Sequence, residues 1–338
     1  MHNARLWTVA GDVIECQLCN HYCRIREGRK GLCQVRKNVE GQLVSLNYGK
    51  LIAAHVDPIE KKPLFHFLPG SKSYSIAATG CNLRCSWCQN WDISQFSNHN
   101  DPDRLAYTSP EQVVKAALRS GCESISYTYT EPTIFYEFAR DVSVLARQAG
   151  LKNMWVSNGY MSGQMLDEYL PLMDAINVDV KAFDENVHHK FTGAHLQPIL
   201  DNCRRLKKVG VWLEVTTLLI PGINDTREQI EGLADFIVNE LGVDTPWHIS
   251  RYYPQPQFQE IQATPPETIL KALKIGEDAG LNFVYAGNLG RYVDTYCPVC
   301  REMLVARSSI WMSENKIIGG VCPKCGTKIA GVWETKSG

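Results

Sequence analysis

The stretch Thr79-Gly80-Cys81-Asn82-Leu83-Arg84-Cys85-Ser86-Trp87-Cys88-Gln89-Asn90 decides how the rest of this sequence is interpreted. It places three cysteines in one short loop, directly after an apolar run, 73–79, that predicts a β-strand. Three thiolates are one fewer than the four protein ligands of a structural zinc site. They suffice to hold three corners of a four-iron cluster, whose fourth iron then stays open for a substrate or cofactor.

Further apolar runs follow at intervals and predict a β/α fold. They are 124–130, 152–158, 175–182, 211–219, 246–252 and 282–287. The segments between them carry helix signals: Ser109-Pro110-Glu111-Gln112 is a capping box and Gly121 suits a C-terminal cap. Thr264-Pro265-Pro266-Glu267 repeats the start signal, and Gly280 repeats the stop signal. Such alternation, with near-continuous apolar strands, is typical of parallel sheets.

The number of these units predicts an α/β fold that is a partial, open-sided β/α barrel. Six or seven units are fewer than the eight of a closed barrel. A flat doubly wound sheet is the alternative, but no glycine-rich dinucleotide fingerprint follows the first strand. We expect a cysteine-rich N-terminal arm at 1–70, the barrel at 71–290, and a zinc-ribbon or rubredoxin-like tail at 291–338.

Composition narrows the class of protein. The chain has 338 residues, 44% of them hydrophobic, and a formal net charge of -1. This is typical of a globular protein and argues against a nucleic-acid partner. The N-terminus lacks the apolar core of a signal peptide, and no stretch approaches the roughly 20 apolar residues of a membrane span. We therefore expect a cytoplasmic protein with no membrane partner.

The thirteen cysteines indicate metal binding rather than disulfides, because most stand at short spacings without a secretory signal. A double knuckle at Cys297, Cys300, Cys322 and Cys325 predicts one metal, zinc or iron. The arm offers four more thiolates, with His21 among them: Cys16, Cys19, Cys23 and Cys33. Zinc, which we slightly prefer, and a second iron–sulfur cluster both suit the arm. Cys122 and Cys203 stand alone and are expected to be small buried hydrophobes.

Polar residues stand where the predicted strands end, which is where a β/α barrel gathers its functional groups. They are Glu131, Asn158, Asp179, Lys181, Glu214, Thr216 and His248. Any one of them could cap a strand or be a satisfied core group. Together, beside a metal-binding loop, they predict one site.

The spacing C-x3-C-x-aromatic-C after the first barrel strand resembles the radical S-adenosylmethionine (SAM) superfamily. The resemblance implies a [4Fe-4S] cluster on Cys81, Cys85 and Cys88, whose open iron chelates SAM. Reductive cleavage of SAM then yields a 5′-deoxyadenosyl radical that abstracts hydrogen. Cys81, Cys85 and Cys88 would thus be the catalytic centre, and a flavodoxin- or ferredoxin-type reductase would supply the electron.

The same resemblance assigns roles to the strand-end residues. Trp87 matches the aromatic residue near adenine, and Glu131 the acid that receives the SAM amino group. Asn158 would bind the ribose, Lys181 the carboxylate, and His248 would face the adenosine. Asp179 would hold a cation or join the carboxylate network. The family's usual glycine pair before the acid is replaced here by Tyr129-Thr130.

Across nearly its whole length the chain resembles the radical SAM member of the AmmeMemoRadiSam system. The shared motifs, besides the cysteine sets, are 57–63 with 67–70, 129–133, 177–181, 221–225 and 247–252. The arm has Asn20 where this family has proline. The resemblance implies Memo-like and AMMECR1-like partners and a relationship to pyruvate formate-lyase activating enzyme. Two hypotheses therefore stand: a radical SAM enzyme, with a glycyl-radical-enzyme activase as one form, or a non-catalytic electron-transfer or partner-binding module. A pure scaffold would not need the polar strand ends.

Overall fold

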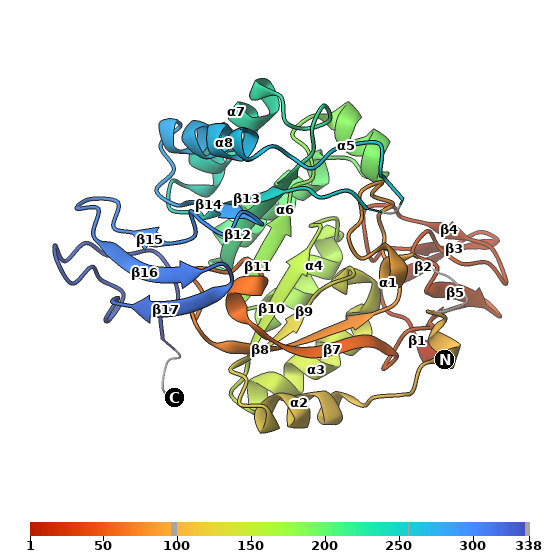
Figure 1. Cartoon of the computed structure of the whole chain (residues 1–338). Coiled ribbons are helices and arrows are strands. Elements are labelled where there is room, and N and C mark those ends of the chain that lie inside the picture. Colours follow the sequence, from red (N-terminus) through yellow and green to blue (C-terminus); the bar gives the residue numbers. More distant parts are fainter. Residues whose placement is uncertain (96–99, 256, 335–338) are drawn as a thin grey trace. The chain divides into compact units, whose positions relative to one another are not determined.

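The computed structural model describes residues 1–95, 100–255 and 257–334 and divides the chain into two compact units (Figure 1). Unit 1 comprises Met1–Asp57, Lys72–Asp174 and Lys190–Asn202. Unit 2 comprises Pro58–Ser71, Ala175–His189 and Cys203–Gly338. Within the described residues, no helix is both long and apolar enough to cross a membrane. The division expected from the sequence, with boundaries after residues 70 and 290, stays a prediction.

Unit 1 contains the first barrel strands. In its part of the sheet the order is β7 (Leu51–Pro58), β8 (Lys72–Ala78), β9 (Ser124–Tyr127) and β10 (Lys152–Ser157). Strand β9 pairs in parallel with both β8 and β10, and every residue of β9 is buried. Helices α2 (Pro110–Arg119) and α3 (Tyr136–Gln148) pack on these strands and on each other. The predicted capping box at Ser109 is present, with both of its reciprocal hydrogen bonds.

The N-terminal arm in unit 1 is built from short antiparallel strands. One sheet has the order β1 (His2–Asn3), β6 (Gln42–Ser45), β5 (Arg36–Val39). The other has the order β2 (Trp7–Ala10), β3 (Val13–Cys16), β4 (Arg24–Ile25). The shorter elements of unit 1 are α1 (Trp91–Ser94), η2 (Pro102–Arg104), η3 (Pro132–Phe135), α4 (Gly163–Tyr169) and η4 (Leu170–Leu172).

Unit 2 continues the parallel pattern. Strands β11 (Ala175–Asp179), β12 (Trp212–Leu219), β13 (Trp247–Arg251) and β14 (Val284–Gly287) pair in parallel in chain order. Helix α8 (Pro266–Asp278) packs on β13, β14 and α7 (Arg227–Phe236). The other elements are η1 (Ile59–Lys61), the π-helix η5 (Ile237–Leu241), β15 (Thr295–Tyr296), β16 (Met303–Ser308) and β17 (Trp311–Asn315). Helices α5 (Glu185–Thr192) and α6 (Gln197–Lys208) have residues in both units.

The structure bears out the seven predicted barrel strands and corrects two details. Strand β7 was not predicted, because His55 and Asp57 interrupt its apolar residues and because residues 54–56 are exposed. The start signal of α8 was misplaced: Pro265, not Thr264, is the N-cap, and no side chain caps the helix. The Thr264 hydroxyl instead donates to the Leu219 carbonyl at 2.6 Å and accepts from Tyr252 N at 3.0 Å. A buried tertiary contact thus takes the hydroxyl that a cap would have used.

Candidate functional site

The loop after β8 is fixed by backbone contacts within unit 1. Arg84 N donates to the Thr192 carbonyl at 2.9 Å, and Ser86 N donates to the Phe191 carbonyl at 3.1 Å. Gly80 has a φ of 109°, and a Cβ there would lie 3.0 Å from the carbonyl oxygen of Cys33. Only glycine can adopt this positive φ and also come so close to the Cys33 carbonyl without strain. Gly80 therefore lets the loop lie close against the arm.

The three loop cysteines are partly exposed thiols with donors around them. Cys81 Sγ accepts from Leu83 N at 3.3 Å and faces Asn158 Nδ2 at 3.9 Å. Cys88 Sγ lies 3.2 Å from Ser94 Oγ. Burial, and next the nearby Glu131 carboxylate, raises the pKa of Cys81 well above its ordinary value. Such a thiol favours its neutral form until a metal cation replaces the proton.

The number of these thiols suits a cluster better than a structural single ion, which takes four protein ligands. Among the described residues, only the C-terminal cysteines bring three or more candidate ligand atoms within 4.8 Å of one another. Cys81, Cys85 and Cys88 do not meet that spacing. A tetrahedral zinc, about 2.3 Å from each sulfur, would hold its sulfurs about 3.8 Å apart. Three thiolates can instead hold three corners of a four-iron cluster and leave its fourth iron open.

Trp87, between the second and third cysteines, is buried and lies against Phe191 with a centroid distance of 5.6 Å. This contact fixes the indole inside unit 1 and fixes the turn that carries Cys85 and Cys88. Its expected role beside adenine stays a prediction.

Glu131 is the most heavily hydrogen-bonded carboxylate near the loop. Its Oε1 accepts from Thr133 N at 3.1 Å, Thr133 Oγ1 at 2.6 Å and Ser157 Oγ at 2.8 Å. Its Oε2 accepts from Asn158 N at 2.8 Å. Burial raises the pKa of Glu131 despite these donors. Because a carboxylate oxygen has two lone pairs, Oε2 can still accept one more hydrogen bond. The sequence did not single out Thr133 as a positioning residue, since it follows the strand end.

Asn158 joins Glu131 to the cysteine loop. Its Nδ2 donates to Asn82 Oδ1 at 2.8 Å, and its Oδ1 accepts from Tyr160 N at 2.9 Å. Glu131, Asn158 and Cys81 therefore lie together in unit 1, and their shared role toward a ligand stays a prediction.

Tyr129 stands where the sequence lacks the expected glycine, yet its backbone adopts a glycine-like conformation. Its φ is 63°, in the left-handed region that bulky residues rarely occupy. Asn90 Nδ2 donates to its carbonyl at 2.7 Å, and its hydroxyl donates to Asp57. Strain of this kind persists where surrounding contacts impose it, often at functional sites.

In unit 2, Asp179 and Lys181 form an ion pair at the end of β11. Their side chains are 25% and 17% exposed, so the pair is accessible to a ligand. Asn224 Nδ2 supports the turn by donating to the Lys181 carbonyl at 2.7 Å. The roles of Asp179 and Lys181 toward SAM stay predictions.

His248 lies in a buried network of unit 2. Its Nε2 is 2.6 Å from Glu214 Oε2. Glu214 also accepts from Phe65 N at 3.0 Å, His66 N at 2.8 Å and Trp212 Nε1 at 2.9 Å. Burial alone would raise the pKa of Glu214, but the hydrogen bond to His248 and the charge of that ring hold it below its ordinary value. One ring nitrogen of His248 is therefore committed to Glu214.

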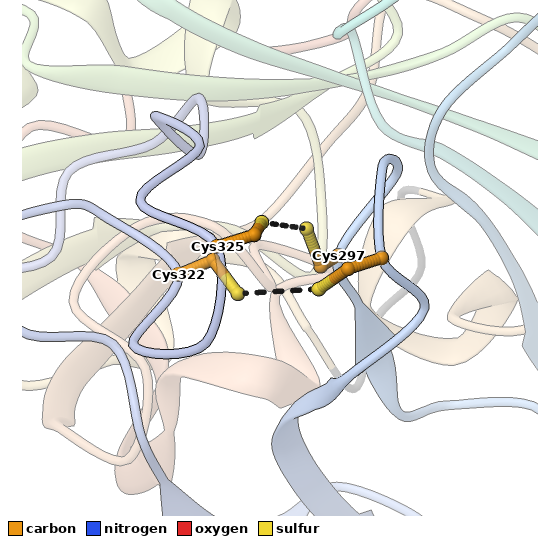
Figure 2. A group of neighbouring side chains, drawn as sticks. Cys297, Cys322 and Cys325 are labelled. Atoms are coloured by element: carbon orange, nitrogen blue, oxygen red, sulfur yellow. Dashed lines mark hydrogen bonds between the residues drawn. The ribbon is translucent and has the colours of Figure 1, made fainter.

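The C-terminal knuckles form a compact candidate metal centre (Figure 2). Cys297 Sγ lies 3.6 Å from Cys325 Sγ, and Cys300 Sγ lies 3.6 Å from Cys322 Sγ. All four sulfurs lie within 4.8 Å of one another, which is the spacing of a tetrahedral ion. The side-chain and backbone groups of Thr327 lower the pKa of Cys325 to about 6. The predicted four-thiolate site at the tail is thus assembled.

The remaining cysteines lie in the arm or stand alone, and the metal expected in the arm stays a prediction. Cys16, Cys19, Cys23 and Cys33 line one cavity in the arm, together with His21. Cys122 and Cys203 are both buried outside these sets.

Comparisons with known proteins agree with this geometry. The model of the radical SAM superfamily matches residues 75–237. An uncharacterized protein of Methanocaldococcus jannaschii is 41% identical over 94% of this chain and 95% of its own length. Pyruvate formate-lyase-activating enzyme of Clostridium pasteurianum is 26% identical over 49% of this chain and 69% of its own. The crystal structure of a radical SAM methyltransferase from Sphaerobacter thermophilus has a TM-score of 0.52 at 17% identity, covering 66% of this chain and 68% of that one. The last likeness supports the predicted partial barrel.

Proposed function

Because the chain belongs to the radical SAM superfamily and is a radical SAM enzyme, we propose that Cys81, Cys85 and Cys88 hold its catalytic [4Fe-4S] cluster. When bound, that cluster supplies the electron that cleaves SAM and starts hydrogen abstraction from a substrate. The observation that carries the proposal is the position of Glu131 and Asn158 beside the loop of three thiols, where Asn158 Nδ2 lies 3.9 Å from Cys81 Sγ. A module that only transferred electrons would not need a buried carboxylate beside its cysteine loop.

The residues of this chain would bind and orient SAM. Glu131 Oε2, with one lone pair remaining, suits the amino group, and Thr133 and Ser157 hold the carboxylate in place. Asn158 would contact the ribose, and Trp87 would pack near adenine. In unit 2, Lys181 would pair with the SAM carboxylate, Asp179 would orient Lys181, and His248 would face the adenosine.

The test is the release of 5′-deoxyadenosine by anaerobically reconstituted protein given SAM and dithionite. Cys85→Ala should abolish release, because two thiolates no longer hold the cluster with one iron open. Cys122→Ala removes a buried thiol outside the three sets and should leave release unchanged. If Cys85→Ala released as much 5′-deoxyadenosine as the parent protein, the assignment would be wrong.

A glycyl-radical activase is a specific form of this function, favoured by the likeness to an activating enzyme. In that case a partner protein would be the hydrogen donor. Mixing the reconstituted protein and SAM with pyruvate formate-lyase of Clostridium pasteurianum should then give a glycyl-radical signal in the EPR spectrum. No signal, with 5′-deoxyadenosine still released, would count against this form and leave the SAM chemistry intact.

We also propose the setting of the reaction. A flavodoxin- or ferredoxin-type reductase would donate the electron, and Memo-like and AMMECR1-like proteins would be partners. The tail would bind one zinc or iron in a structural role, and the arm would bind a further metal. Free thiols at all three sets require a reducing compartment, which favours the cytoplasm.

A further inference from the structure

The N-terminal arm folds around a cavity whose chemistry the SAM site does not use. Its lining includes Cys16, Cys19, Cys23 and Cys33, and also Arg36 and Asn82. Cys16 is the last residue of β3, and its N–H donates to the Cys23 carbonyl at 2.9 Å. A Cβ on Gly31 would lie 3.6 Å from Cys23 Sγ, so the turn before Cys33 runs close to that thiol. The sequence thus delivers four thiols to one enclosed space.

The spacing of these sulfurs separates the arm from the tail. In the tail, all four sulfurs lie within 4.8 Å of one another, close enough for one tetrahedral ion to gather them. Among the described residues, no three ligand atoms of the arm's cysteines and His21 meet that criterion. The same is true of Cys81, Cys85 and Cys88. In this respect the arm resembles the central loop and differs from the tail, which favours a group larger than one ion.

Arg36, which lines this cavity, carries donors without acceptors. Its side chain is 1% exposed, and its Nη2 donates to Glu137 Oε1 at 2.7 Å and to the Arg5 carbonyl at 2.6 Å. Within the described residues, its Nε and Nη1 atoms have no hydrogen-bond partner. A buried N–H without an acceptor costs about 1–3 kcal/mol, and more on a charged group. An anionic group with several acceptor atoms beside Arg36 would satisfy these donors.

Asn82 is another such donor, and it joins the cavity to the catalytic loop. Its Nδ2 is buried and also lacks a partner within the described residues. Its backbone carbonyl lies 2.7 Å from His21 Nε2, and it directly follows Cys81. The close approach of Gly80 to Cys33 brings a further point of that loop against the arm. The two cysteine sets thus share a wall within unit 1.

We propose that Cys16, Cys19, Cys23 and Cys33 hold a second four-iron cluster, with Arg36 and Asn82 donating N–H groups to its sulfurs. Four thiolates close all four irons, so this cluster has no open position for SAM. Donors to cluster sulfurs are a main means by which proteins tune such a group. Asn82 links the arm cluster to the loop of the catalytic cluster. The arm cluster could nevertheless form whether or not the chain cleaves SAM.

The experiment removes the catalytic set and counts what remains. After anaerobic reconstitution, the variant Cys81→Ala/Cys85→Ala/Cys88→Ala should keep about four irons and four sulfides per chain, with the Mössbauer spectrum of a four-iron cluster. This variant leaves the arm untouched, so arm misfolding does not confuse the result. Adding Cys16→Ala/Cys19→Ala should remove that iron. The proposal would be overturned if the triple variant held one tetrahedral zinc in the arm, or if it held no metal there.

Two further variants separate this proposal from the catalytic one. Cys16→Ala/Cys19→Ala with Cys81, Cys85 and Cys88 intact should lose about four irons and keep the signal of the SAM-binding cluster. Arg36→Lys keeps the charge that faces Glu137 but removes the guanidinium donors. In the triple-variant background it should shift the reduction potential of the arm cluster to a lower value, because fewer donors stabilise the reduced charge. An unchanged potential in a folded Arg36→Lys protein would exclude Arg36 as a ligand-tuning residue.

Discussion

At the scale of single residues, the site depends on side chains that hold other side chains. Glu131 is fixed by donors from Thr133, Ser157 and Asn158, and Asn158 reaches the sulfur of Cys81. Each of these contacts leaves Glu131 Oε2 in one position with a lone pair to spare. The carboxylate is thus preorganised before any ligand arrives, which reduces the entropy lost on binding.

Glu131→Gln tests this arrangement. The change removes the charge and one acceptor oxygen, and a hydrogen bond to a charged group contributes about 1.5–3 kcal/mol. We expect SAM affinity to fall about 10- to 150-fold, measured by anaerobic titration calorimetry. Glu267→Gln changes an exposed carboxylate in the first turn of α8 and should leave the affinity unchanged. An unaltered Kd for Glu131→Gln would remove this residue from the SAM site.

The sequence predicted candidate metal ligands wherever those ligands form a short local pattern. The spacing of Cys81, Cys85 and Cys88 and the double knuckle required no structure, because their ligands are local. The roles of Tyr129 and Arg36 were not visible. Tyr129 is a bulky residue with a φ of 63°, and Arg36 has the sequence context of an ordinary surface cation but a side chain only 1% exposed. Both states follow from long-range packing that local propensity does not report.

At the scale of elements, the segment Pro58–Ser71 connects the strands and the tail of unit 2. Phe65 and His66 donate backbone N–H groups to Glu214, and Phe65 packs with Phe283 and Leu304 in one apolar cluster. Arg307 of β16 donates to the Phe65 carbonyl at 2.7 Å and pairs with the buried Glu60. The sequence does not reveal this role, since the partners of the segment are more than a hundred residues away in the chain.

His66 makes this segment sensitive to acid. Burial lowers the pKa of His66 to about 4 from 6.5. Its Nδ1 lies 2.7 Å from the Ala330 carbonyl and its Nε2 lies 2.6 Å from Tyr285 Oη, so the neutral ring donates once and accepts once. Protonation would remove the acceptor of the Tyr285 hydroxyl. Because the unfolded chain binds this proton more tightly, stability is lost as pH falls through 6.5 toward 4.

The stability lost on protonation of His66 can be measured by comparing the free energy of unfolding of the parent protein with that of His66→Gln. The shift corresponds to about 3 kcal/mol in full, of which about 2 kcal/mol should be lost between pH 7 and pH 5. His66→Gln should lose correspondingly less over that interval, measured by anaerobic urea unfolding at each pH. Taking the difference between the two proteins removes the contributions of other groups, including Glu60, whose pKa burial raises and whose effect has the opposite sign. Parallel pH profiles for the two proteins would contradict the assignment.

At the scale of the whole chain, the cysteines divide into three sets that we expect to bind different metal groups. The tail brings four sulfurs within 4.8 Å of one another, whereas among the described residues the central loop and the arm form no such close set. The alternation of strands and helices, and so the parallel pattern in each unit, was predictable because it depends on local periodicity. The choice between one ion and a cluster was not, because sequence spacing does not give the distance between sulfurs in the folded chain.

This division predicts a metal inventory that separates into independent parts. The intact chain should hold about eight irons in two clusters, plus one ion at the tail. Cys300→Ala should release that one ion and keep the cluster iron, because the tail cysteines lie in another unit from both cluster sites. Its yield of 5′-deoxyadenosine per catalytic cluster should stay at the parent value, since four thiolates leave the ion no open position for chemistry. Elemental analysis with Cys122→Ala as control gives the metal content, and the 5′-deoxyadenosine assay gives the yield. Loss of cluster iron in a folded Cys300→Ala protein, or of 5′-deoxyadenosine at full cluster content, would show that the tail ion is more than structural.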